Sequence, residues 1–159
     1  MIKTALGQDS HRFETKNLSK PLILGGVQIP NETGLEGNSD ADVVLHALTN
    51  AVSGITTVNI LGKKADELCI EKGIKDSKIY LQKSLEYLNG YKITHISFSV
   101  EALKPKLAGY IDKIRENIAN LLGISLDCVA MTATTGEGLT DFGKGLGIQV
   151  FVIITAEKK

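Results

Sequence analysis

The chain of 159 residues is poor in aromatic side chains, in cysteine and in net charge. It has no tryptophan, four tyrosines and four phenylalanines, too few to suggest a surface on which nucleic-acid bases stack. Its two cysteines, Cys69 and Cys128, show no pairing pattern, which favours a reducing compartment over a disulfide-rich secreted class. Eighteen basic residues balance eighteen acidic ones, so no overall field attracts nucleic acid or an anionic membrane, and any phosphate must be held locally.

Long hydrophobic runs are also missing. The longest apolar stretch, residues 148–154, is interrupted by Gln149 and is too short to cross a bilayer as a helix. Residues 1–4 lack the apolar run of a signal peptide. We therefore expect a cytoplasmic protein without a membrane or nucleic-acid partner, or a plastid-type location if a transit peptide was removed from a eukaryotic precursor. The length fits one domain over residues 1–159.

Apolar periodicity predicts strands with helices between them. The expected strands are 4–11, 22–29, 93–100, 129–133 and 148–155. The expected helices are one that starts after Ser39 or Asp40 and runs to Val52, and two at 77–88 and 107–122. The strand at 22–29 should bend at Gly25 and Gly26, and Ser39 or Asp40 should cap the helix that follows. No pattern assigns residues 55–73. The order of elements predicts an α/β (α+β) class, with a single-domain mixed β-sheet and helices packed on one face.

Acidic and imidazole side chains occur together in two segments. If residues 9–11 are extended, Asp9 and His11 project from the same face, because a strand repeats every second residue. His46 lies one turn after Asp42 on the predicted helix, so these two side chains should leave the same side. Asp9, His11 and His46 together offer ligands suited to zinc, with a fourth position open. The residues alone leave open a structural alternative, in which Asp9 makes a turn hydrogen bond, His11 is exposed, and His46 is a histidine on a partly buried helix with its hydrogen bonds satisfied.

A second polar cluster follows the strand predicted at 129–133. Thr134 and Thr135 supply hydroxyls, and the glycines after them let backbone amides approach an anion, as in a phosphate cradle. Glu137 could hold a hard cation such as magnesium on that phosphate. Lys106, near the start of a helix, offers a further cation. An ordinary polar loop and a solvated lysine are the alternative interpretations.

Several spaced blocks lie in order along essentially the whole chain. They are Gly7-x-Asp9-x-His11, Leu24-Gly25-Gly26-Val27-x-Ile29-Pro30, Ser39-Asp40-x-Asp42-Val43-x-Leu45-His46-Ala47-Leu48-Thr49, Asp76-Ser77 and Ala133-Thr134-Thr135-x-Glu137-x-Leu139. Together they resemble the 2-C-methyl-D-erythritol 2,4-cyclodiphosphate synthase family. Any one block would be a weak signal, whereas the ordered set is a specific one.

The resemblance implies a homotrimer of α/β subunits with an active site at each interface. It implies conversion of 4-diphosphocytidyl-2-C-methyl-D-erythritol 2-phosphate into the cyclic diphosphate with release of CMP, a phosphorus–oxygen lyase reaction of non-mevalonate isoprenoid biosynthesis. Zinc would lie on Asp9, His11 and His46, and magnesium or manganese on Glu137. Thr135 would polarise the α-phosphate. Further substrate contacts are implied for Asn38, Ser39, Lys106 and Thr134.

Departures from the family pattern fall on substrate contacts and spare the metal ligands. Asn38 replaces the usual histidine and cannot carry a positive charge to a phosphate. Ile60 stands where a carboxylate for the ribose is expected, and residues 65–69 replace a Phe-Pro-Asp-Thr-Asp loop. Two alternatives follow: a divergent member acting on another nucleotide diphosphate, and a non-catalytic zinc-containing trimer that binds a nucleotide or an isoprenoid diphosphate. Retention of Thr135 and Glu137 favours catalysis.

Overall fold

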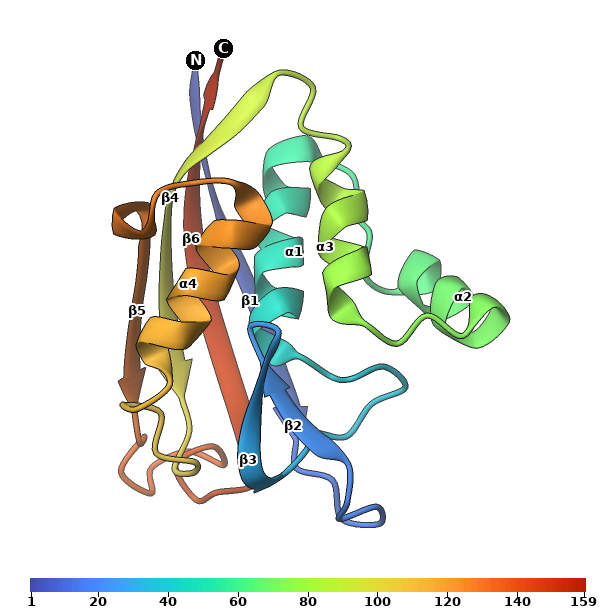
Figure 1. Ribbon diagram of the computed structural model, residues 1–159, viewed down its shortest axis with the longest axis vertical. Coiled ribbons are helices and arrows are strands. Elements are labelled where there is room, and N and C mark those ends of the chain that lie inside the picture. The colour runs from blue at the N-terminus through green and yellow to red at the C-terminus, as the bar shows by residue number, and fades with distance from the viewer.

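A four-stranded mixed sheet forms the frame of the protein (Figure 1). In the computed structural model, which describes residues 1–159, the strand order is β1-β6-β4-β5. β6 (Gly147–Lys158) pairs antiparallel with β1 (Ile2–Arg12) and with β4 (Tyr91–Glu101), whereas β4 and β5 (Val129–Thr134) are parallel. The prediction of a mixed sheet is confirmed. The two chain ends lie side by side, because β1 and β6 pair along their whole length.

Helices cover one face of this sheet. α1 (Val43–Thr56) packs on β1 and β6, and α4 (Ile111–Leu122) packs on β5. α3 (Ser77–Leu85) packs on α1, and α2 (Lys63–Lys72) lies beyond α3 (Figure 1). In β6 alternate residues are buried under the helices, whereas Phe151 and Ile153 point the other way and are 41% and 49% exposed. β6 is therefore an inner strand of the sheet but is buried on one face only.

The segment expected to form one bent strand is instead a separate hairpin. β2 (Pro21–Leu24) and β3 (Val27–Thr33) pair antiparallel around Gly25 and Gly26, whose φ angles are 61° and 77°. Two successive residues with positive φ reverse the chain, and glycine adopts that conformation without steric cost. The backbone amides of this turn then remain to be satisfied by another part of the chain.

Asp42, and neither Ser39 nor Asp40, caps α1. Its carboxylate accepts from Gly25 N at 2.8 Å, from Gly26 N at 2.6 Å and from Leu45 N at 3.0 Å, and the residue is fully buried. One carboxylate thus joins the hairpin turn to the start of α1. The prediction of the cap was wrong, because the side chains of Ser39 and Asp40 accept from Ala41 N and Asp42 N, ahead of the helix. The Asp42 side chain bonds to the β2–β3 turn and to Leu45 N, so it does not extend toward His46.

The segment that no sequence pattern assigned contains α2. Residues 65–69 are therefore helical and do not form a loop. Ile60 is 3% exposed and forms a small core with Ala65, Cys69 and Tyr80. No helix in the structure combines the length and apolarity that a bilayer crossing requires.

Candidate metal centre

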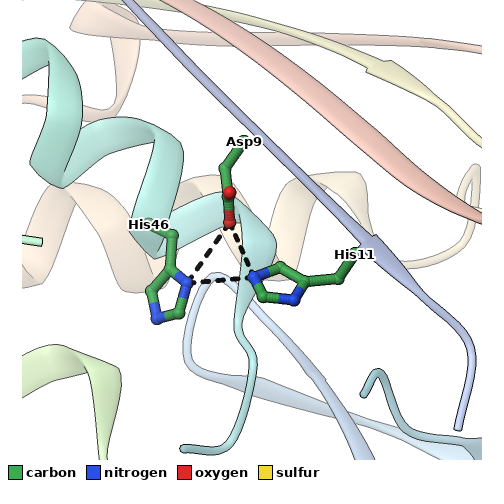
Figure 2. A group of neighbouring side chains, drawn as sticks. All are labelled: Asp9, His11 and His46. Carbon is green, nitrogen blue, oxygen red and sulfur yellow. Dashed lines mark hydrogen bonds and ion pairs between the residues drawn. The ribbon is translucent and has the colours of Figure 1, made fainter. Parts of the chain in front are cut away.

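β1 and the start of α1 bring Asp9, His11 and His46 together (Figure 2). Asp9 and His11 project from β1 toward α1 because they are two residues apart on a strand. Gly7 lies on the same face of β1 and permits a close approach, since a Cβ there would lie 2.0 Å from the carbonyl oxygen of Ala47. His46, in the first turn of α1, therefore faces the two β1 side chains.

The three facing atoms form a small triangle. His11 Nε2 lies 2.9 Å from Asp9 Oδ2, His46 Nδ1 lies 3.2 Å from the same oxygen, and the two nitrogens are 3.3 Å apart. A tetrahedral zinc ion with bonds of about 2.0 Å holds its ligand atoms about 3.3 Å apart. The structure therefore brings the three predicted ligands to a spacing that suits a metal ion.

Hydrogen bonds on the far side of each imidazole show which nitrogen is free. His11 Nδ1 lies 2.9 Å from the carbonyl oxygen of Glu36, which can only accept, so Nδ1 carries the proton. Ser77 Oγ donates to Asp40 Oδ1 and therefore accepts from His46 Nε2, 2.8 Å away. The lone pairs of His11 Nε2 and His46 Nδ1 consequently face Asp9.

Asp9 Oδ2 is the atom on which both lone pairs converge. It is buried and has no hydrogen-bond donor. Such an orphaned oxygen among nitrogen lone pairs is stabilised by a cation, so the donor set fits a zinc-type ion. The alternative with an exposed His11 does not hold, because the side chains of His11 and His46 are only 22% and 11% exposed.

The cluster also favours the ionised form of its carboxylate. Burial alone would raise the pKa of Asp9, but when His11 and His46 are protonated their hydrogen bonds to the carboxylate and their charges together lower it. Burial alone would lower the pKa of His11, but the hydrogen bond and charge of Asp9, with the Glu36 carbonyl, raise it. A carboxylate that is ionised at neutral pH is the form that binds a metal ion.

The cluster lies in the wall of a hollow of about 330 Å³. Asn38 and Ser39 line this hollow from the loop before α1, so both predicted substrate residues adjoin the candidate metal ligands. The opposite wall comes from α2, the segment before it and α3, through Leu61, Gly62, Ala65, Asp66, Cys69 and Tyr80. Cys69 Sγ donates to the carbonyl oxygen of Asn38 at 3.3 Å, which links the two walls.

The second predicted cluster lies at the opposite edge of the sheet. Thr134 ends β5, and Thr135 and Glu137 follow it in an exposed loop, in which Thr135 Oγ1 accepts from Glu137 N at 3.3 Å. Lys106 is exposed between β4 and α4. β1 and β5 are separated by β6 and β4, which puts the two edges about 14 Å apart. Within one chain the structure does not bring these residues to the metal cluster.

Sequence reasoning missed the neighbours of His46. Ser77 and Asp40 lie on its far side, although Asp76-Ser77 indicated only the start of a helix. Asp76 does cap α3, because its side chain accepts from Lys78 N at 3.0 Å. Ser77 could have been identified from the sequence, because it belongs to Asp76-Ser77, one of the blocks that carry the family resemblance.

Fold and site together define a class: α+β proteins that hold an Asp-His-His cluster between an edge strand and a helix. The family model described as the YgbB family matches residues 2–157. The 2-C-methyl-D-erythritol 2,4-cyclodiphosphate synthase of Chlamydia muridarum (strain MoPn / Nigg) is 48% identical over 156 residues, covering 98% of this chain and 88% of that protein. The chain belongs to the YgbB family, and the resemblance seen in its sequence blocks is confirmed.

Solved structures share the fold over the full chain. The bifunctional IspDF from Campylobacter jejuni superposes with a TM-score of 0.90 at 28% identity, and covers 100% of this chain, which spans 43% of that longer chain. IspF of Plasmodium falciparum, solved as a CDP complex, superposes with a TM-score of 0.82 at 27% identity over 99% of this chain and 97% of that one.

Proposed function

We propose that this protein is a 2-C-methyl-D-erythritol 2,4-cyclodiphosphate synthase, a CMP-releasing phosphorus–oxygen lyase. The observation that carries the proposal is the cluster of Asp9, His11 and His46, in a chain that matches the YgbB family over residues 2–157. The name of the Chlamydia relative supplies the product, and the CDP complex of the Plasmodium protein supplies the nucleotide class. The substrate is then 4-diphosphocytidyl-2-C-methyl-D-erythritol 2-phosphate.

The reaction needs alignment and charge neutralisation more than a protein nucleophile. An oxygen of the substrate's 2-phosphate attacks the β-phosphorus of the diphosphate. The bond from this phosphorus to the oxygen that bridges to the α-phosphate breaks, and CMP leaves with that oxygen. Holding the attacking and leaving oxygens in line supplies most of what an intramolecular phosphoryl transfer requires.

Two cations belong to this proposal. Asp9, His11 and His46 would hold zinc, and Glu137 would hold magnesium or manganese. Glu137 offers a single exposed carboxylate, which suits magnesium because that ion is commonly bound through one or two carboxylates together with substrate phosphates. Bound cations of this kind withdraw charge from phosphate oxygens as it develops.

The remaining residues bind and orient the substrate. Asn38 and Ser39 line the hollow beside the cluster and contact the methylerythritol 2-phosphate end. The Thr135 hydroxyl donates to the α-phosphate. Thr134 and Lys106 lie near the cytidine and its phosphates, where the lysine contributes positive charge.

Two observations support a homotrimer with an active site at each interface. The metal cluster and the loop after β5 lie at opposite sheet edges, so one substrate reaches both only if β1 of one subunit adjoins β5 of the next. Such a head-to-tail contact forms a closed trimer when neighbouring subunits are related by a three-fold rotation. In addition, Leu6, Phe151 and Ile153 are exposed on the helix-free face, with Leu6 opposite Ile153, and form an apolar surface for packing about the axis.

Phosphorus NMR tests the proposal directly. The purified protein is mixed with zinc, magnesium and the proposed substrate, and the spectra are followed for CMP and a cyclic diphosphate. Both signals should appear. Intact substrate in the presence of folded, zinc-loaded protein would overturn the proposed function.

A further inference from the structure

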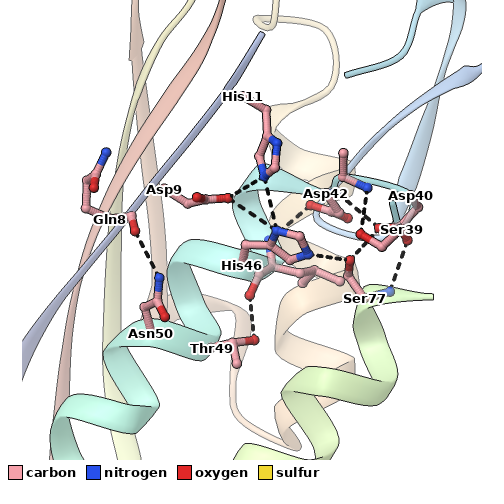
Figure 3. A network of polar contacts seen from close by, with 12 residues as sticks. Gln8, Asp9, His11, Ser39, Asp40, Asp42, His46, Thr49, Asn50 and Ser77 are labelled. Carbon is pink, nitrogen blue, oxygen red and sulfur yellow. Dashed lines mark hydrogen bonds and ion pairs between the residues drawn. The ribbon is translucent and has the colours of Figure 1, made fainter. Parts of the chain in front are cut away.

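A polar chain leads from His46 away from the metal cluster (Figure 3). His46 Nε2 donates to Ser77 Oγ at 2.8 Å, and Ser77 Oγ donates to Asp40 Oδ1. Asp40 Oδ2 also accepts from Ser77 N at 3.1 Å. The Asp40 carboxylate therefore binds both the side chain and the backbone of Ser77, and a single hydroxyl connects its charge to the imidazole.

Burial makes this series of hydrogen bonds rigid. Ser77 is fully buried and His46 is 8% exposed, so little water competes for their hydrogen bond. Asp40 N donates to the carbonyl oxygen of Lys75 at 2.9 Å, which ties the loop before α1 to the segment before α3. The position of the Ser77 hydroxyl is therefore set by two elements and not by one flexible side chain.

The two candidate histidine ligands differ in what lies behind them. His11 donates to a neutral peptide carbonyl, that of Glu36, whereas His46 donates to a hydroxyl that is bound to a carboxylate. A carboxylate behind a metal-binding histidine fixes its tautomer and ring orientation and makes it a better ligand. His46 has such support through Ser77 and Asp40.

We propose that Ser77 and Asp40 are positioning residues that hold His46 with its proton on Nε2 and its Nδ1 lone pair toward Asp9, and so raise the zinc affinity of the cluster. The inference rests on the proposed metal site. Without the Ser77 hydroxyl, the ring can take the tautomer with a proton on Nδ1. That proton would bond to Asp9 Oδ2, and this hydrogen bond would compete with a metal ion.

The test compares zinc affinity of the full chain with that of Ser77→Ala, by competition with a chromophoric chelator. We expect the variant to bind zinc about 10- to 100-fold more weakly. Ser84→Ala is the matched control, because Ser84 lies on the same helix, is 1% exposed and donates only to the carbonyl oxygen of Leu81, at 2.6 Å. Both variants lose one buried hydroxyl, with two side-chain hydrogen bonds at Ser77 and one at Ser84, but only Ser77→Ala should lose zinc affinity.

A second variant and a spectroscopic readout separate positioning from general stability. Asp40→Asn keeps an oxygen for the Ser77 hydroxyl but loses the charge, so its zinc affinity should lie between those of the wild type and Ser77→Ala. The chain has three histidines, which makes ¹⁵N-histidine NMR tractable. In the presence of EDTA, His46 should carry its proton on Nε2 in the wild type and in Ser84→Ala, and should become a tautomer mixture in Ser77→Ala.

The outcomes are distinguishable. Equal zinc affinity and an unchanged His46 tautomer in Ser77→Ala would overturn this inference and leave the proposed function standing. A zinc affinity equal to that of the wild type in Asp40→Asn would show that the Asp40 carboxylate has no part in positioning His46. A wild-type protein that binds no zinc would overturn both this inference and the proposed metal chemistry.

Discussion

Single neutral groups that are not themselves metal ligands decide whether the metal cluster can form. Gly7 lets α1 approach β1, the carbonyl of Glu36 fixes the tautomer of His11, and Ser77 contacts the far nitrogen of His46. None of these three groups, a glycine, a peptide carbonyl and a serine hydroxyl, is a usual zinc ligand. They act by controlling where the ligand atoms lie, which for a site of this size means a tolerance of about 0.5 Å.

Gly7→Ala should damage both stability and metal binding. The new Cβ would lie 2.0 Å from Ala47 O and 2.6 Å from Ala51 N, and because these are backbone atoms the whole of α1 must shift. We expect the free energy of unfolding to fall by about 3 kcal/mol, measured by urea denaturation, with weaker zinc binding. Gly109→Ala is the control, since a Cβ there meets nothing within 4 Å. Equal behaviour of the two variants would refute the close-approach argument.

Asp9→Asn should abolish turnover while the assembly survives. The amide keeps the size of the side chain but removes the anionic ligand on which both imidazoles converge. We expect a loss in kcat of at least about 100-fold and loss of bound zinc, with an unchanged sedimentation coefficient. His46→Ala should behave in the same way. Activity that persists in a zinc-free variant would show that zinc has no role in the reaction.

At the scale of elements, the site depends on how α1 and α2 begin and where they lie. α1 starts at the Asp42 carboxylate, which also accepts from the amides of the β2–β3 turn. Ile60, which stands where the family pattern has a carboxylate that binds the ribose, is buried against α2. α2 instead presents Asp66 to the hollow beside the metal cluster.

Asp42 should make stability fall as pH rises. Burial, only partly offset by hydrogen bonds from Leu45, Gly26 and Gly25, raises the pKa of Asp42 from 3.8 to about 6. The folded state therefore binds a proton more tightly than the unfolded state, and this stabilisation is lost between about pH 4 and about pH 6. Over that window the wild type should lose about 3 kcal/mol relative to Asp42→Asn. Urea denaturation of both chains in EDTA measures the difference, and parallel pH profiles would contradict the prediction.

Asp66→Asn should weaken substrate binding without slowing the chemical step. Asp66 lines the hollow, whereas Glu67, the next residue of α2, faces a different depression beside α3. We expect KM to rise about 3- to 10-fold with kcat unchanged, the pattern of a lost binding contact. Glu67→Gln is the charge-matched control and should leave both constants unchanged. A lower kcat in Asp66→Asn would place the residue in the chemical step instead.

At the scale of the whole molecule, the sheet has two unequal faces and two edges that carry the candidate site residues. One face is buried under helices, and the other exposes Leu6, Phe151 and Ile153. The candidate metal ligands lie at the β1 edge and the Thr134–Glu137 segment at the β5 edge. A second subunit that covers the apolar face and joins the two edges accounts for both features.

Phe151→Asp should dissociate the proposed trimer. A charge in the centre of the apolar face is costly to bury between subunits, so sedimentation velocity should show a folded monomer. Turnover should fall with assembly, because in the proposed trimer the residues after β5 come from a neighbouring subunit. Ile70→Asp is the control, since Ile70 is 73% exposed on α2, away from the sheet. A fully assembled and active Phe151→Asp would contradict the proposed packing.

The sequence by itself determined the features that depend on neighbours along the chain. Alternating residues defined β4, and a run rich in Val and Ile defined β6. Helical spacing defined α1 and α4, and the period of a strand placed Asp9 and His11 on one face. It missed α2, in which only Ala65 and Cys69 are buried, because so weak an apolar face leaves little periodicity to detect.

Only the tertiary structure decided which local elements meet. The choice of Asp42 as the cap depends on amides of the β2–β3 turn, and the far nitrogen of His46 is satisfied by Ser77, which lies 31 residues away. Periodicity reports the environment of each residue relative to its neighbours in sequence, but not the identity of the atoms packed against it. The sequence named the three candidate metal ligands, but the spacing of their ligand atoms, the hollow beside them and their separation from the loop after β5 are set by that packing. These features became visible only in the folded chain.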